Sequence, residues 1–167
     1  VTPGSGTGVS VQELGRPFRQ CYKVTVTYAA LSAAALTAGH DRLKRHPLPA
    51  GARWLHELGI TNAQGRPREG MSDKFRQVQR FAELLSPLFA EAFPEDAPGN
   101  AAPLRLVDAG SGKGYLTFAL AEVLGARATL SGIERRPELV ELCNRVARDC
   151  GLAPRLRFIS GGIAEVP

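Results

Sequence analysis

A run of alternating glycines offers the clearest chemistry in this sequence. Asp108 is followed by Gly110, Gly112 and Gly114 in the segment DAGSGKG. Glycines let a backbone turn tightly and approach a ligand without interference from a Cβ atom. A helix that begins after such a loop presents unpaired N–H groups and a positive dipole end to an anion. The candidate ligand contacts in this loop are Asp108, Ala109, Gly110, Ser111, Gly112 and Gly114.

A second acidic residue follows at a spacing suited to a nucleoside. Glu134 lies 20 residues after Gly114, at the end of the apolar segment ATLSGIE. A carboxylate at the end of the second strand of a nucleotide-binding fold can accept hydrogen bonds from both hydroxyls of a ribose. Glu134 is therefore a candidate contact for the ribose of a cofactor.

Two phosphate-containing cofactor classes fit the loop poorly. A phosphate-binding loop reads GxxxxGK[ST], but Val107 replaces its first glycine and Gly114 replaces its hydroxyl residue. A dinucleotide loop reads GxGxxG, and here the third glycine comes one residue early, with Tyr115 in its place. A dinucleotide also carries a pyrophosphate, which the Asp108 carboxylate would repel.

S-adenosylmethionine (SAM) fits the charges better, because it carries a carboxylate, an ammonium and a sulfonium but no phosphate. The helix N-terminus can take the carboxylate, and Asp108 can attract the cationic groups directly or through water. We therefore expect a SAM-dependent transferase. Two alternatives stay open: a non-catalytic binding module of similar fold, and a dinucleotide-dependent oxidoreductase.

The elements around the loop alternate between strand and helix. Apolar patterning predicts strands over residues 104–110, 128–134 and 156–160, and helices over residues 115–125 and 137–151. This order predicts an α/β fold class, a Rossmann-like doubly wound sheet of which these residues form the first half, with three parallel strands. We expect the first strand to be buried on both faces. Ligands of such sheets bind at the carboxyl ends of the strands.

Residues 1–97 are predicted to form a small mixed α/β extension, and residues 98–167 the cofactor-binding half-domain. We expect residues 1–10 to lack order, residues 21–28 to form a strand and residues 29–36 a short helix. A helical turn should end at Gly59. A longer helix should begin with Ser72 as its N-cap and end or kink at Pro87. The Pro/Gly-rich segment 93–103 marks the boundary.

The segment DAGSGKGYLTFAL resembles the first motif of class I SAM-dependent methyltransferases, and Glu134 matches their acidic second motif. The resemblance covers residues 103–167. It implies SAM as the cofactor and places the loop, Glu134 and its neighbour Arg135 in the cofactor site. The family often carries an acid after the third strand to meet the adenine, but Gly161 and Gly162 occupy this stretch. A contact near Ile163, or Glu165, is expected in its place.

A second resemblance covers roughly residues 40–85. The segments HDRLKR, WLHELGIT and MSDKFRQVQRFAELL resemble a bacterial methyltransferase family with an N-terminal extension, related to eukaryotic methyltransferase-like proteins. That resemblance implies that Met71, Ser72, Lys74 and Gln77 border the cofactor or substrate cleft. Lys74 is the one of these four that we count among the cofactor contacts.

The net charge of +5 is concentrated in one stretch. Residues 40–80 contain nine Lys or Arg and four Asp or Glu, an excess equal to that of the whole chain. Such a concentration of positive charge can attract a phosphate backbone, so RNA is the first expectation for the acceptor. A solvated basic surface is the alternative, and a small-molecule or protein acceptor also stays open.

Three further features of the sequence concern the cellular location of the protein. No apolar run reaches the roughly 20 residues that a membrane-spanning helix needs, and the first ten residues lack the pattern of a signal peptide. Cys21, Cys143 and Cys150 form no CxxC pair. We expect reduced thiols, a cytoplasmic location, no metal and no membrane partner. The oligomeric state stays open.

The chain starts at Val1 and ends at Pro167, shortly after the third expected strand. The resemblance implies a sheet of seven strands, of which three are expected here. We therefore expect the residues that orient the methyl acceptor to lie beyond residue 167. No catalytic residue is assigned, and these 167 residues alone are expected to be inactive.

Overall fold

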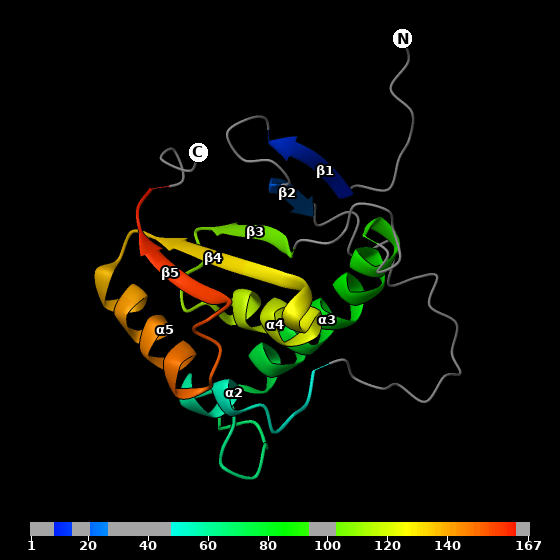
Figure 1. Cartoon of the computed structure of the whole chain (residues 1–167). Helices are drawn as coiled ribbons and strands as arrows, with labels where there is room; N and C mark the ends of the chain where they lie inside the picture. Colours follow the sequence, from blue (N-terminus) through cyan, green and yellow to red (C-terminus); the bar gives the residue numbers. More distant parts are fainter. Residues whose placement is uncertain (1–8, 15–20, 27–47, 94–102, 163–167) are drawn as a thin grey trace, which may run out of the picture. The chain divides into compact units, whose positions relative to one another are not determined.

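The computed structural model describes residues 9–14, 21–26, 48–93 and 103–162 (Figure 1). The chain divides into two compact units, Val1–Arg45 and His46–Pro167. The helix expected over residues 29–36 and the contacts expected near Ile163 and Glu165 lie outside the described residues.

The first unit contains an antiparallel pair of strands, β1 (Val9–Leu14) and β2 (Cys21–Val26). Val9 pairs with Val26, and Leu14 pairs with Cys21. The strand predicted over residues 21–28 is confirmed. The prediction that residues 1–10 lack order is wrong for the last two of them, because the β-branched, alternating segment VSVQEL forms β1.

The second unit contains three parallel strands in the order β3 (Leu104–Ala109), β4 (Ala128–Glu134) and β5 (Leu156–Ser160). Helix α4 (Tyr115–Leu124) and a 3-10 turn η1 (Gly125–Arg127) join β3 to β4, and α5 (Pro137–Asp149) joins β4 to β5. The predicted βαβαβ run of three parallel strands and its Rossmann-like class are confirmed.

Two further helices, α2 (Arg53–Glu57) and α3 (Ser72–Ala92), belong to the same unit. The chain turns after α2 at Gly59, which has φ +76°, as the helical-turn prediction requires. The N-cap of α3 is Met71, so Ser72 is the first helical residue and not the cap.

Helix α3 also continues through Pro87, which was predicted to end or kink it. A proline inside a helix removes one backbone hydrogen bond. Pro87 is exposed, whereas Leu85 and Phe89 are buried on the other side of the helix. Packing of the buried side therefore holds both halves of α3 in one helix.

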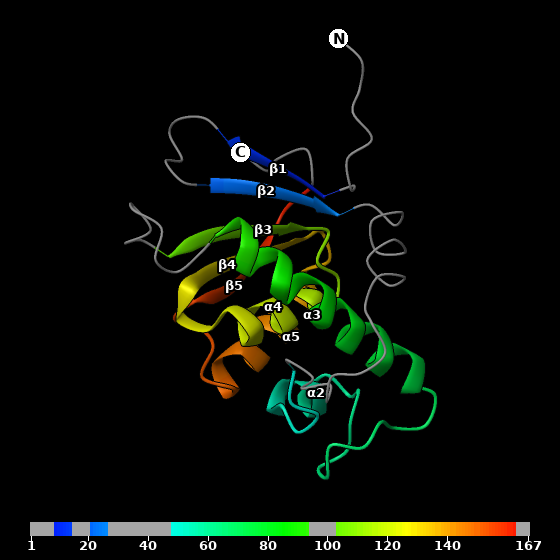
Figure 2. The same cartoon turned by 90° about the vertical axis from the view of Figure 1, so that its right-hand side faces the viewer.

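The three parallel strands have one buried face and one exposed face. Leu106, Leu130 and Phe158 are buried on the face that the described helices cover (Figures 1 and 2). Val107 and Ile159 point to the other face and are 37% and 41% exposed. Every described helix of the unit lies on one side of these strands, so among the described residues the second face of the first strand, expected to be buried in a complete sheet, is exposed.

Three aromatic rings connect the helices to the sheet below the candidate site. Trp54 of α2 stacks on Phe118 of α4 with 5.5 Å between ring centroids. Phe118 in turn lies 5.4 Å from the ring of Phe158 on β5. Trp54 and Phe118 are almost fully buried. This row of three rings packs α4 against α2 and β5.

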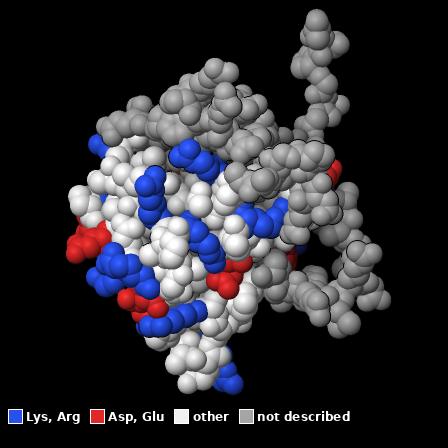
Figure 3. Space-filling model, in the orientation of Figure 1, with Lys and Arg blue, Asp and Glu red and all other residues white. Residues whose placement is uncertain are grey.

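The basic stretch of residues 40–80 is partly neutralised by acids within it and by the nearby Glu83. Arg53 pairs with Glu57 at 3.5 Å, Arg80 pairs with Glu83 at 3.1 Å, and Arg76 pairs with Asp73. Figure 3 shows basic and acidic side chains interspersed on one face of the described part of the chain as a whole. Arg42, Lys44 and Arg45 lie outside the described residues. The described part of the stretch therefore offers fewer unpaired charges than its composition indicates.

Candidate functional site

The glycine loop after β3 is anchored on the end of β4. The backbone N–H groups of Gly110 and Ser111 both donate to the carbonyl of Ile133, at 2.8 and 3.0 Å. The N–H of Gly114 donates to the Ser111 carbonyl at 2.8 Å and closes the turn. The loop and the carboxyl end of the neighbouring strand thus form one structure, as expected for a parallel sheet.

Gly112 and Gly114 need to be glycine for different reasons. Both have a left-handed backbone, with φ +57° and +69°. A Cβ on Gly114 would lie 2.7 Å from the ring of Phe158, so the loop packs directly on the aromatic row. A Cβ on Gly112 would meet only the Nη2 atom of Arg136, at 3.9 Å. Gly114 therefore faces the core, and Gly112 faces open space that a ligand can enter.

Asp108 lies at the end of β3, where burial raises its pKa above the ordinary 3.8. The hydroxyl of Thr117 donates to its Oδ2 atom at 2.6 Å and partly offsets this rise. Thr117 is fully buried in the first turn of α4. The site thus places a carboxylate beside the N-terminus of a helix, with a hydroxyl that holds its orientation.

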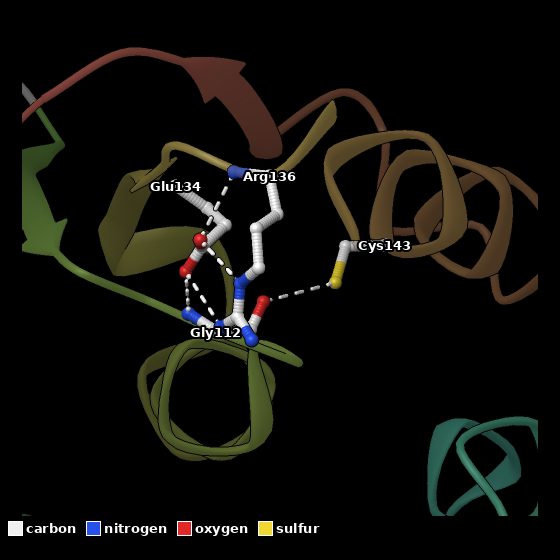
Figure 4. Close-up of polar contacts among 4 residues, drawn as sticks. All are labelled: Gly112, Glu134, Arg136 and Cys143. Atoms are coloured by element: carbon white, nitrogen blue, oxygen red, sulfur yellow. Dashed lines mark hydrogen bonds and ion pairs between the residues drawn. The ribbon is translucent and has the colours of Figure 1, made fainter. Parts of the chain in front are cut away.

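Glu134 ends β4 and is 7% exposed. Its Oε2 atom accepts a hydrogen bond of 2.9 Å from the backbone N–H of Gly112. Arg136 donates to Oε1 through its backbone N at 3.1 Å and its Nε at 2.9 Å (Figure 4). These contacts, with those of the Arg136 guanidinium first, lower the pKa of Glu134 to about 2. Glu134 is therefore ionised at neutral pH.

The thiol of Cys143 contacts the glycine loop from α5. Its Sγ donates to the carbonyl of Gly112 at 3.9 Å (Figure 4). Burial and the charge of Glu134 raise the pKa of Cys143 to about 11, so the thiol keeps its proton. Both backbone groups of Gly112 are thus held by side chains, the N–H by Glu134 and the carbonyl by Cys143.

Lys74 brings α3 to the start of α4. Its Nζ lies 5.8 Å from the centroid of the Tyr115 ring, within the range of a cation–π contact. The same atom donates to Oε1 of Gln77 at 2.8 Å. Lys74, one of the four residues that the resemblance placed at the cleft, therefore lies beside Tyr115, the first residue after the glycine loop.

The other predicted residues differ in their surroundings. Met71 is half-buried before α3, and Ser72 is exposed. Arg135 is exposed, whereas its neighbour Arg136 holds Glu134. Ile163 and Glu165 lie outside the described residues.

Three side chains of the site were not predicted: Thr117, Arg136 and Cys143. Only Thr117 had a signal in the sequence, a hydroxyl residue one helical turn after the last loop glycine. Among the described residues, no group of three or more His, Cys, Asp or Glu could hold a metal. No described helix is long and apolar enough to cross a membrane.

Comparisons with known proteins identify relatives of this chain. A family described as a methyltransferase domain matches residues 73–167, more than half of the chain. A protein-L-isoaspartate O-methyltransferase of Caenorhabditis elegans is 45% identical over 110 residues, which are 65% of this chain and 49% of that protein. The chain thus spans about half the length of this curated relative.

Solved structures of methyltransferases also resemble the chain. An RNA methyltransferase from Salinibacter ruber in complex with S-adenosylhomocysteine is 26% identical, with a TM-score of 0.36 over 49% of each chain. A geranyl diphosphate methyltransferase in complex with SAM is 22% identical, with a TM-score of 0.36 over 66% of this chain and 41% of that one.

Proposed function

This chain belongs to the methyltransferase-domain family of SAM-dependent, class I enzymes, and we propose that its glycine loop and Glu134 hold the cofactor. The whole protein would then transfer the methyl group to an acceptor. The observation that carries the proposal is the 2.9 Å hydrogen bond from Gly112 N to Glu134. It joins the loop and the acid in one wall of the site.

The residues of the site match the charges of SAM. The N-terminus of α4 suits the carboxylate of the methionyl part, and Lys74 adds a positive charge beside it. Asp108 suits the cationic groups. Glu134, ionised at neutral pH, suits the ribose hydroxyls. The open side of Gly112 leaves room for close approach of a ligand to the backbone.

SAM supplies a methyl group already activated by its sulfonium, so methyl transfer needs alignment more than a strong catalytic group. In the proposal, Asp108 and Glu134 fix the two ends of the cofactor, and the glycine loop lets it lie against the backbone. Removal of a proton from the acceptor needs a base where the acceptor carries one. We assign no described residue to that role.

RNA is the acceptor that the basic stretch favours, because phosphate contacts by Lys and Arg dominate the affinity for nucleic acids. The pairing of Arg53, Arg76 and Arg80 with neighbouring acids weakens this support. A protein carboxyl group is the second candidate, favoured by the name of the nematode relative. Methylation assays with radiolabelled SAM, bulk RNA and an isoaspartyl peptide separate the two acceptors.

Calorimetric titration with S-adenosylhomocysteine and with NADH tests the cofactor proposal. We expect saturable binding of S-adenosylhomocysteine and none of NADH. Binding of NADH alone would assign the site to an oxidoreductase. Binding of S-adenosylhomocysteine by the whole protein, without methyl transfer to any acceptor, would indicate a non-catalytic module.

A further inference from the structure

The carboxylate of Glu134 has no acceptor position left for a ligand. Gly112 N and Nη2 of Arg136 reach its Oε2 at 2.9 and 3.3 Å. The backbone N and Nε of Arg136 reach its Oε1 at 3.1 and 2.9 Å. A carboxylate offers about four lone-pair sites. A ribose that donates two hydrogen bonds to Glu134 therefore has to replace donors that are already bound.

These donors differ in how easily they can leave. The amides of Gly112 and Arg136 are backbone groups, held by the loop and by the start of α5. The other two donors belong to the Arg136 guanidinium, on a side chain that is 60% exposed. The carboxylate end of this pair is buried, but the guanidinium end reaches water, which can solvate it once it leaves Glu134. The guanidinium is therefore the part that a ligand can displace.

The guanidinium also covers the open side of the loop. Its Nη2 lies 3.9 Å from the place that a Cβ on Gly112 would take. Figure 4 shows the side chain of Arg136 reaching from the start of α5 across Glu134 to Gly112. The guanidinium of Arg136 thus lies next to both Gly112 and the carboxylate of Glu134.

We infer that Arg136 is a displaceable latch on the cofactor site. Its guanidinium binds Glu134 in the free protein and leaves when the two ribose hydroxyls of an adenosyl ligand take its place. Two O–H donors replace two N–H donors, so the buried carboxylate keeps its full set of hydrogen bonds. The inference rests on the proposed function, since it requires Glu134 to receive the ribose.

The affinity for S-adenosylhomocysteine at neutral pH tests the latch, by calorimetry on the wild type, Arg136→Ala and Arg145→Ala. Arg145 is an exposed arginine of α5 and is the matched control. Arg136→Ala should bind about two- to fivefold more tightly, because the ligand no longer has to displace the guanidinium from Glu134. Arg145→Ala should match the wild type. Thermal unfolding establishes that both variants are folded.

The outcomes separate the latch from the cofactor proposal. Wild-type binding with equal or weaker affinity in Arg136→Ala overturns the latch and leaves the cofactor proposal standing. No binding by the wild type removes both. A second readout is the Nε–H resonance of Arg136 in the unmodified protein. Saturation with S-adenosylhomocysteine should move it to the position of a free arginine side chain, and an unmoved resonance overturns the latch.

Discussion

Thr117 holds Asp108 across the glycine loop, through a hydrogen bond of 2.6 Å from its hydroxyl to Oδ2. The two residues are nine apart in the sequence and lie on different elements, the end of β3 and the first turn of α4. Since burial already raises the pKa of Asp108, the hydroxyl is the donor that favours its charged form. Orientation and charge of this carboxylate therefore depend on Thr117.

Replacement of Thr117 by Val should raise the pKa of Asp108 further and destabilise the fold. The buried carboxylate loses its partner, which costs about 1–3 kcal/mol. Thr117→Ser keeps the hydroxyl and is the control. Denaturant unfolding at neutral pH measures the loss, and equal stability of the Val and Ser variants would show that this hydrogen bond contributes nothing.

Asp108 should make SAM binding depend on pH. Its pKa is raised, so it takes up a proton before Glu134 does as the pH falls toward 3.8. Affinity for cationic SAM should then fall more steeply than affinity for S-adenosylhomocysteine, which lacks the sulfonium. At neutral pH, Asp108→Ala should weaken SAM binding by about 1.5–3 kcal/mol, the scale of a charged hydrogen bond.

The matched variant for the pH profile is Asp108→Asn, in which the difference between the two ligands should no longer change with pH. Calorimetry over the acidic range provides the measurement. If the difference in affinity between SAM and S-adenosylhomocysteine still changes with pH in Asp108→Asn, a group other than Asp108 causes that change.

Glu134 should contribute stability that disappears in acid. Its pKa is lowered from 4.5 to about 2, so the native state favours the ionised form. The contribution is complete above 4.5 and is lost as the pH falls from 4.5 toward 2. The free energy of unfolding of Glu134→Gln should therefore vary less with pH over this window than that of the wild type. Parallel pH profiles would contradict the assignment.

Alanine at the two loop glycines should have different effects. Gly114→Ala places a Cβ 2.7 Å from Phe158 and should destabilise the fold by about 1–3 kcal/mol, the cost of overpacking. Gly112→Ala meets open space and should cost only the left-handed backbone, about 1–2 kcal/mol. It should still weaken S-adenosylhomocysteine binding by roughly tenfold or more. Near-normal affinity in Gly112→Ala would show that the loop does not touch the cofactor.

RNA binding by the basic stretch, if RNA is the acceptor, should weaken steeply with salt. Each neutralised phosphate adds roughly 0.7–0.9 to the slope of log affinity against log salt. Arg66→Gln removes an exposed arginine and should lower the slope by about one such step. Filter binding at several salt concentrations measures the slope, and a salt-independent affinity would leave the stretch without a nucleic-acid role.

The βαβαβ run was predictable because each of its elements shows a clear period in the sequence. The strands Ala128–Glu134 and Leu156–Ser160 have the predicted bounds, and α5 begins at the predicted Pro137. Tertiary packing can override local signals, and Pro87 did not end its helix as one of the two predicted outcomes had it. Pro87 remains inside α3 because buried side chains on both sides of it hold the helix.

The site was predictable only as far as the backbone determines it. The glycine loop and Glu134 follow from spacing, because strand ends of a parallel sheet meet at one edge. The contacts of Arg136 and Cys143 depend on how side chains point from the turn after β4 and from α5. Neither turn geometry nor helical period distinguishes Arg135 from Arg136 in the sequence. The predicted helix start at Tyr115 is correct and places Thr117 in the first turn, but the sequence does not show that its hydroxyl points to Asp108.

Backbone amide NMR of the protein during titration with S-adenosylhomocysteine tests most directly whether the glycine loop and Glu134 form a cofactor site. The amides of Gly110, Gly112, Gly114 and Glu134 should shift and saturate together, while those of Gly59 and Gly70, outside the site, stay in place. NADH at the same concentration should leave all of them unchanged. Unmoved loop amides at saturating S-adenosylhomocysteine, or the same shifts with NADH, would contradict the cofactor assignment.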